Sequence, residues 1–199
     1  MSDPTRVESA APTSRSYNRW LGRARLVLLF AALILLLAWS EPTPFSVSFG
    51  FIFIFVGESI RFWAAGHLHK TTRLITSGPY RYTRNPLYLG RLLIFTGFAL
   101  MTRLPWSLHL AVLALGYAIF FIYYLPRKER VEPARLRALH GARYQRYFSA
   151  VPSLFPRRSP WPHAERDGWY SSRMLRNREH WMVIGLALAT ILLLVRAYR

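Results

Sequence analysis

The sequence of 199 residues contains no cysteine, which excludes disulfides, thiolate catalysis and cysteine metal sites. Acidic side chains are also scarce, since 9 Asp and Glu stand against 27 Lys and Arg, for a net charge of +18. The six His residues show no HExxH or similar spacing, so no metal site is predicted. The basic charge is accompanied by no zinc, helix-turn-helix or ribonucleoprotein signature, and nucleic acid is therefore not an expected partner.

Apolar residues make up 52% of the chain, and they are segregated from the charges. Each of five apolar segments approaches the about 20 residues that a helix needs to cross the hydrocarbon layer of a bilayer. These segments are 20–39, 45–65, 87–102, 105–125 and 181–197. We expect an all-α protein, a polytopic membrane helical bundle of about five transmembrane helices.

The basic residues predict the orientation of these spans. Most Lys and Arg fall in 1–25, 66–86 and 127–179, and five spans place all three regions on the same side. Because positive loops stay inside, we expect a cytosolic N-terminus, cytosolic active-site loops and an external C-terminus. The same charge is expected to attract anionic lipid.

The remaining organisation is simple. Residues 1–18 are rich in Ser, Pro, Thr and Ala and are predicted to be a mobile N-terminal segment. Residues 19–199 are predicted to form a single integral-membrane domain, because no loop is long enough to hold its own core. Pro133 suits the first turn of a short helix that ends at Gly141. The Pro-rich residues 156–170 predict an irregular connector.

Ionisable residues occur inside the apolar segments. Glu58 and Arg61 lie one helical turn apart in the second segment. Because charges at membrane depth are costly, a functional or a paired role is expected for them. Arg91, just inside the third segment, is positioned to reach a carboxylate or a lipid phosphate.

Two motifs between residues 60 and 160 carry the most specific signal. The first is GPYRYTRNPLY (78–88), and the second begins EPARLRALHGARYQRYFSAVP at Glu132. In this order, around two spans, they resemble the isoprenylcysteine carboxyl methyltransferase and phospholipid methyltransferase family of integral-membrane enzymes. The resemblance implies S-adenosylmethionine (SAM) held in a cytosol-facing pocket between helices, and a lateral opening for a lipophilic acceptor.

The resemblance also implies roles for individual residues. Cofactor-binding positions of the family match Tyr80, Asn85, Pro86, Leu87, Tyr88 and Glu132, and in some members also the stretch Thr72, Arg73, Leu74 and Ile75. Lys128 matches a basic position linked to the acceptor, and Arg61 and Arg91 are further candidates for substrate binding. The chain departs from the pattern at Asn85, where many members have His, and at Pro133, which replaces a second acidic residue.

The chemistry of SAM explains these residue types. A carboxylate such as Glu132 accepts hydrogen bonds from ribose hydroxyls or from the ammonium group, and the rings of Tyr80 and Tyr88 offer π faces to the sulfonium. Glu129, at a different azimuth of the helix, is expected to matter much less. In-line methyl transfer depends mainly on alignment, so no catalytic residue is assigned.

Each residue also has a structural alternative. The tyrosines are also typical of an aromatic belt at the membrane interface. Glu132 could instead be a negative charge at a helix N-terminus, where the helix dipole favours it. Arg84 could instead anchor its loop by pairing with Glu129 or Glu132.

The sequence thus predicts a SAM-dependent methyltransferase that acts on a lipophilic or membrane-embedded acceptor. An isoprenylcysteine carboxylate, a lipid amine and a thiol all fit, whether the acceptor is a small molecule or a lipidated protein. A membrane reductase of the sterol-reductase kind, which uses NADPH, and a non-catalytic membrane scaffold are the alternatives.

Overall fold

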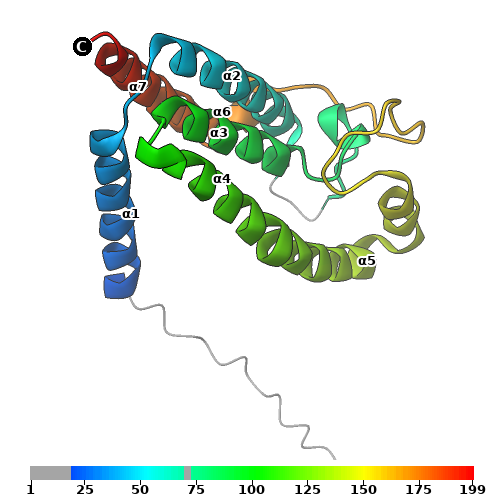
Figure 1. Cartoon of the computed structure of the whole chain (residues 1–199). Coiled ribbons are helices and arrows are strands. Elements are labelled where there is room, and N and C mark those ends of the chain that lie inside the picture. Colours follow the sequence, from blue (N-terminus) through cyan, green and yellow to red (C-terminus); the bar gives the residue numbers. More distant parts are fainter. Residues whose placement is uncertain (1–18, 70–72) are drawn as a thin grey trace, which may run out of the picture. The chain divides into compact units, whose positions relative to one another are not determined.

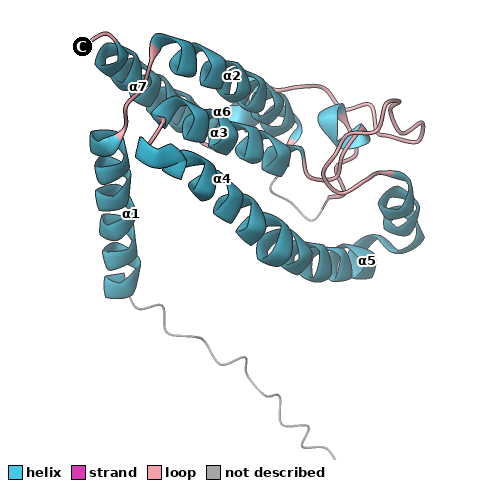
Figure 2. Ribbon diagram, viewed as in Figure 1, coloured by secondary structure: helices cyan, strands magenta, loops and turns pink. Residues whose placement is uncertain are grey.

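The computed structural model describes residues 19–69 and 73–199, and the segment 1–18 that was predicted to be mobile lies outside them. Over the described residues the chain forms helices and loops without strands (Figure 2), which confirms the all-α prediction. The helices are α1 (Arg19–Trp39), α2 (Pro44–His67), the 3-10 turn η1 (Gly78–Arg81), α3 (Pro86–Thr102), the 3-10 turn η2 (Pro105–Ser107), α4 (Leu108–Ala118), the π-helical η3 (Ile119–Tyr124), α5 (Leu125–Ala150), α6 (Ser171–Arg176) and α7 (Glu179–Ala197).

Each of the five predicted apolar segments is helical. By length and composition, α2, the segment Pro105–Ala150 (η2 to α5) and α7 can cross a membrane, and α3 is a shorter apolar helix. These helices make the chain an integral membrane protein. The chain divides into two compact units, 1–35 and 36–199, and the second contains every site described below.

Helices α2 and α3 form an antiparallel pair (Figure 1). α2 begins at a capping box, in which Thr43 and Ser46 each bond to the backbone N–H of the other. Further along, its backbone approaches α3 at two pairs of glycines, Gly50 with Gly97 and Gly57 with Gly90. A Cβ on Gly57 would lie 2.7 Å from the Gly90 carbonyl oxygen, so side chains at this seam would push the helices apart.

Arg61 joins α2 to α3 and α7. Its side chain is buried, and its Nη2 donates to the Glu179 carboxylate of α7 at 2.5 Å. Its Nη1 donates to the Leu87 carbonyl of α3 at 3.3 Å, and its Nε lies 3.7 Å from Glu58. The paired role predicted for Glu58 and Arg61 is confirmed, with Glu179 as a third member of the cluster.

The helix that contains Pro133 differs from the prediction. α4 continues through η3 into α5 as one long helix (Figure 1), so the prediction that a helix begins at Pro133 is wrong. Upstream, Pro126 lacks the N–H that would bond to the carbonyl four residues back. The preceding turn is widened, with the Leu125 N–H bonded to Phe120. α5 does break at Gly141, where φ is 50° and ψ is −128°, as the predicted stop requires.

Residues 151–170, beyond α5, are irregular, which confirms the predicted connector and extends it toward the N-terminus. Val151, Leu154 and Trp161 are buried there. Val151 and Trp161 pack with Tyr144 and Tyr147 of α5. The connector is therefore a packed part of the fold, and it holds one side of the site described next.

Candidate active site

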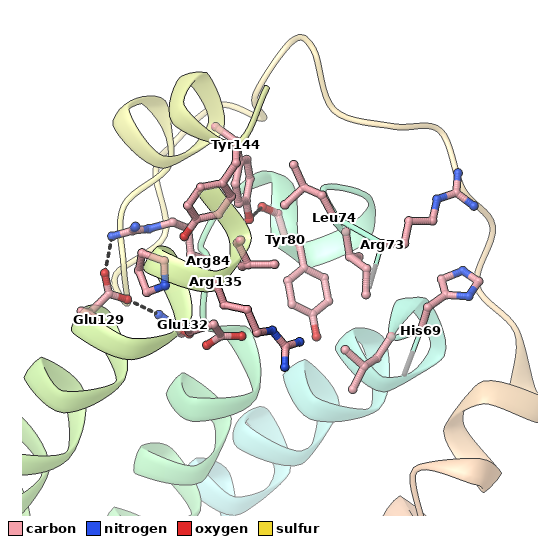
Figure 3. A pocket seen from close by; sticks show the side chains of 15 residues that line it. His69, Arg73, Leu74, Tyr80, Arg84, Glu129, Glu132, Arg135 and Tyr144 are labelled. Atoms are coloured by element: carbon pink, nitrogen blue, oxygen red, sulfur yellow. Dashed lines mark hydrogen bonds and ion pairs between the residues drawn. The ribbon is translucent and has the colours of Figure 1, made fainter. Parts of the chain in front are cut away.

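A cavity of about 490 Å³ lies between the end of α2, the loops on both sides of η1, and α5 (Figure 3). Its volume is in the range of small-molecule and cofactor pockets. It is lined by Leu68, His69, Arg73, Leu74, Ile75, Tyr80, Arg84, Asn85, Glu129, Glu132, Pro133, Arg135, Leu136, Tyr144 and Tyr147. Both sequence motifs therefore contribute to its walls.

The turn that carries Tyr80 packs closely against the end of α2, and a glycine makes this possible. Gly78 has a φ of +57°, and a Cβ there would overlap the ring of His67, at the end of α2. Ser77 Oγ and His67 Nδ1 lie 3.2 Å apart, within hydrogen-bonding distance. On the other side, the Tyr147 hydroxyl donates to the Tyr80 carbonyl at 2.8 Å. The backbone of Tyr80 is thus held between α2 and α5.

The loop after η1 is joined to the connector that follows α5. The Arg84 N–H donates to the Pro152 carbonyl at 2.9 Å, and the Thr83 hydroxyl donates to the Leu154 carbonyl, also at 2.9 Å. Asn85 Nδ2 also donates to the Ser153 carbonyl at 2.9 Å, so the first motif contacts the end of the second across 68 to 71 residues of sequence.

Glu129 is the centre of the polar network at this junction. Its carboxylate accepts from Arg84 Nη2 at 2.7 Å, from Asn85 Nδ2 at 2.9 Å and from Ser153 Oγ at 2.8 Å. This confirms Arg84 as an anchor paired with Glu129. Although Glu129 is expected from the sequence to matter little, it lines the cavity as Glu132 does. Its spacing of three residues from Glu132, which places both on one side of a helix, was the available signal.

Lys128 extends the same network from Asn85 toward Glu132 and Tyr88. Its ammonium group donates to Asn85 Oδ1 and lies 3.0 Å from a Glu132 oxygen. It also sits 4.1 Å from the centre of the Tyr88 ring. The amide of Asn85 thus donates to Glu129 and accepts from Lys128. A neutral histidine at this position would offer one donor and one acceptor on a larger ring.

The predicted site residues fall into three groups. Those that line the cavity are Arg73, Leu74, Ile75, Tyr80, Asn85 and Glu132. Those that do not are Pro86, Leu87 and Tyr88, in the first turn of α3, and Arg61, Lys128 and Arg91. Thr72 lies outside the described residues. Lys128 adjoins the cavity through Asn85 and Glu132, whereas Arg61 belongs to the ion cluster between the helices and Arg91 is exposed beside Tyr88.

Tyr80 presents an unsatisfied hydroxyl to the cavity. Its side chain is 8% exposed, and its hydroxyl has no hydrogen-bond partner among the described residues. Burial raises the pKa of this phenol well above its usual range. In Figure 3 the ring stands in the middle of the cavity, and Glu132 and Arg135 extend from α5 toward the hydroxyl end. A buried polar atom of this kind points to a ligand or an ordered water.

Comparisons with known proteins show which family and which relatives the chain resembles. The sequence model of the family described as phospholipid methyltransferase matches residues 46–128. The cobalt-zinc-cadmium resistance protein CzcN of Cupriavidus metallidurans is 32% identical over 162 residues, which cover 75% of this chain and 71% of that protein. The nickel-cobalt-cadmium resistance protein NccN of Alcaligenes xylosoxydans xylosoxydans is 33% identical over 102 residues, which cover 50% of this chain and 44% of that protein. No solved structure matches the chain.

Proposed function

Because the chain belongs to the isoprenylcysteine carboxyl methyltransferase and phospholipid methyltransferase family, we propose that it is a SAM-dependent methyltransferase acting on a lipophilic or membrane-embedded acceptor. The observation that carries this proposal is the cavity that both family motifs line. It combines two carboxylates, several guanidinium groups, aromatic rings and the unsatisfied Tyr80 hydroxyl.

The lining residues fit the parts of SAM. Glu132, whose side chain is half-exposed, suits the ribose hydroxyls or the ammonium group as a charge-assisted acceptor. Arg135 and Arg73 suit the carboxylate of the methionine part. Leu74 and Leu136 offer an apolar surface to the adenine, and the Tyr80 hydroxyl a donor.

When bound, SAM supplies an electrophilic methyl group on a sulfonium, and the protein has to align it. Glu129 holds Arg84 and Asn85 in place, which keeps the loop between the two motifs rigid. A rigid loop maintains the line of attack, on which the rate of a displacement depends. The apolar lining residues Leu74, Ile75 and Leu136 would help to exclude water from the reacting atoms.

We place the acceptor next to Lys128 and Tyr88, at the outer side of the Asn85 network. Tyr88 is in contact with Tyr124 of η3, and the apolar surface of α4 and η3 is exposed. A lipophilic acceptor can lie along that surface and extend only its polar end to Lys128. A prenylated cysteine carboxylate, a lipid amine and a thiol are the candidate polar ends, and we propose that this face is cytosolic.

Ligand-induced thermal stabilisation in detergent tests the proposal, since a ligand that binds only the folded state raises its stability. S-adenosylhomocysteine should raise the melting temperature of the wild type and raise that of Glu132→Gln much less. Glu41→Gln, an exposed carboxylate away from the cavity, serves as the matched control. Stabilisation by NADPH instead would support a reductase, and stabilisation by neither ligand a scaffold.

The names of CzcN and NccN refer to metal resistance, which suggests where to seek a phenotype. We propose that any contribution of this chain to growth under cobalt, zinc or cadmium stress depends on methyl transfer. Complementation of a deletion strain by the wild type but not by Glu132→Gln would support this. Equal complementation by both would contradict it.

A further inference from the structure

A second cavity, of about 290 Å³, lies beside the candidate active site. It is lined by His69, Tyr170, Ser172, Arg173, Arg176 and Asn177, together with Leu68. Leu68 and His69 also line the larger cavity, so the two spaces share a wall. Nothing in the proposed methyl transfer makes use of the second cavity.

The side chains of this cavity suit an anion. Its lining includes two guanidinium groups and an imidazole, without a carboxylate. Arg173 is held in a fixed orientation, because its Nη1 and Nη2 donate to the two oxygens of Asp167 at 2.7 and 3.4 Å and its guanidinium lies 4.2 Å from the centre of the Tyr170 ring. These hydrogen bonds from Arg173, and a further one from His69, hold the pKa of Asp167 at about 2. Because Asp167 and the Gly168 carbonyl take up three of its five N–H donors, Arg173 would bind a phosphate through Nε and the second hydrogen of Nη2.

The position of the cavity relative to the candidate membrane spans favours a lipid as the source of the phosphate. Two of the candidate membrane spans, α2 and α7, end at His67 and begin at Glu179, and α6 packs against both. The cavity is lined by residues just beyond these two ends, at the level where lipid head groups lie. Trp169, Tyr170 and Trp181 are exposed nearby, as is typical of aromatic side chains at a membrane interface.

Helix α7, which packs against α6, has an exposed surface that suits an acyl chain. Trp181, Ile184 and Leu188 are exposed at a spacing of three and four residues, so they form one stripe along the helix. The stripe begins at the head-group level and runs into the apolar layer. A lipid with its phosphate at α6 would lay its chains along this stripe.

We propose that the second cavity binds the phosphate of an anionic membrane lipid, with Arg173 and Arg176 as its ligands. The site is distinct from the acceptor position beside Lys128, and it does not rest on methyl transfer. Because His69 contributes to both cavities, lipid bound here also stabilises one wall of the candidate active site.

Lipid binding to the full-length protein in neutral detergent, measured by native mass spectrometry, tests this proposal. Phosphatidylglycerol should bind the wild type more tightly than phosphatidylcholine does. Arg176→Gln should weaken the binding of phosphatidylglycerol about fivefold, and the double variant with Arg173→Gln more than about tenfold. Arg176→Gln is the safer variant, because it leaves the pair of Arg173 with Asp167 intact.

The control is the double variant Arg146→Gln and Arg158→Gln, which removes the same charge from exposed positions outside the cavity and should retain phosphatidylglycerol. Equal loss of lipid in this control would reduce the effect to net charge and overturn the site. Equal affinity for the two lipids would also overturn it. Thermal stability measured with added phosphatidylglycerol and with added inorganic phosphate separates the two sources. Equal protection by both at the same concentration would assign the cavity to free phosphate instead.

Discussion

The helical bundle of α2, α3 and α7 and the polar region around the cavity are held together by different contacts. In the bundle, helix backbones touch at the glycine pairs, and Arg61 joins the three helices through its buried ion pairs and its hydrogen bond to the Leu87 carbonyl. Around the cavity, loops are joined by hydrogen bonds from side chains to backbone and from side chain to side chain. Small residues allow close packing where lipid gives helices little reason to associate, whereas a ligand site needs its polar groups fixed in place.

This difference leads to separable effects of mutation. Substitutions in the bundle should lower the stability of the fold and leave the ligand affinity of the surviving folded protein unchanged. Substitutions in the polar region should lower the affinity and change the stability little.

The largest effect is expected at Arg61. Arg61→Met keeps an aliphatic side chain of similar length but removes the guanidinium. The Glu58 and Glu179 carboxylates are then left buried without their cation. Breaking a buried ion pair costs about 3–5 kcal/mol, so the melting temperature in detergent should fall sharply. Adding Glu58→Gln and Glu179→Gln to the variant should recover part of the loss. A normal melting temperature with a raised Michaelis constant for the acceptor would return Arg61 to the substrate-binding role predicted from the sequence.

A smaller loss of stability is expected at the seam between α2 and α3. The added Cβ of Gly97→Ala would lie 2.5 Å from the Gly50 carbonyl oxygen, so the helices must separate, at a cost of about 1–3 kcal/mol. Gly185→Ala on α7 is the matched control, because a Cβ there meets nothing within 4 Å. Equal melting temperatures for the two variants would show that the glycines are not needed for packing.

In the polar region, Glu132→Gln and Glu129→Gln should both weaken the binding of S-adenosylhomocysteine. For Glu132 the reason is a lost ligand contact, and for Glu129 it is a loosened loop. Calorimetric titration should therefore show a loss of about 1–3 kcal/mol in each variant, and the double variant should lose less than the sum. An unchanged affinity in Glu129→Gln would restore the minor role that its helical azimuth predicted.

The smallest effects are expected among the tyrosines at the edge of the site. Tyr88→Ala removes the ring beneath Lys128 and should affect the acceptor more than the cofactor. Tyr124 is a poor control, since its ring packs on Tyr88. Tyr123 is exposed and bonded to Arg127, and Tyr123→Ala should have no measurable effect. Equal Michaelis constants for the acceptor in Tyr88→Ala and Tyr123→Ala would favour the interfacial belt.

The sequence predicted the features that depend on local patterns. The apolar segments, the break at Gly141 and the irregular connector are all found, because hydropathy and turn chemistry act over a few residues. It did not predict the second partner of Arg61, since Glu179 lies 118 residues away and only the packing of α7 brings it close. The helix through Pro133 was missed because the tertiary fold continues a helix where the local signal suggests a new start.

The candidate site was predicted in part. Tyr80, Asn85 and Glu132 were assigned through the motifs and do line the cavity. Tyr144 and Tyr147 belong to the second motif, yet only their burial against the connector distinguishes them from interfacial tyrosines. Tyr88, in contrast, has a motif position but turns toward Lys128. A motif indicates which segments meet, whereas the direction of each side chain depends on the fold.

Photo-crosslinking of radiolabelled SAM to the wild-type protein, followed by peptide mapping, tests the central claim most directly. The label should appear in peptides from 73–85 or 129–147, which line the cavity on opposite sides, and excess S-adenosylhomocysteine should remove it. Label in peptides from 105–125 or 171–197, or label that S-adenosylhomocysteine does not displace, would contradict the assignment of this cavity to the cofactor.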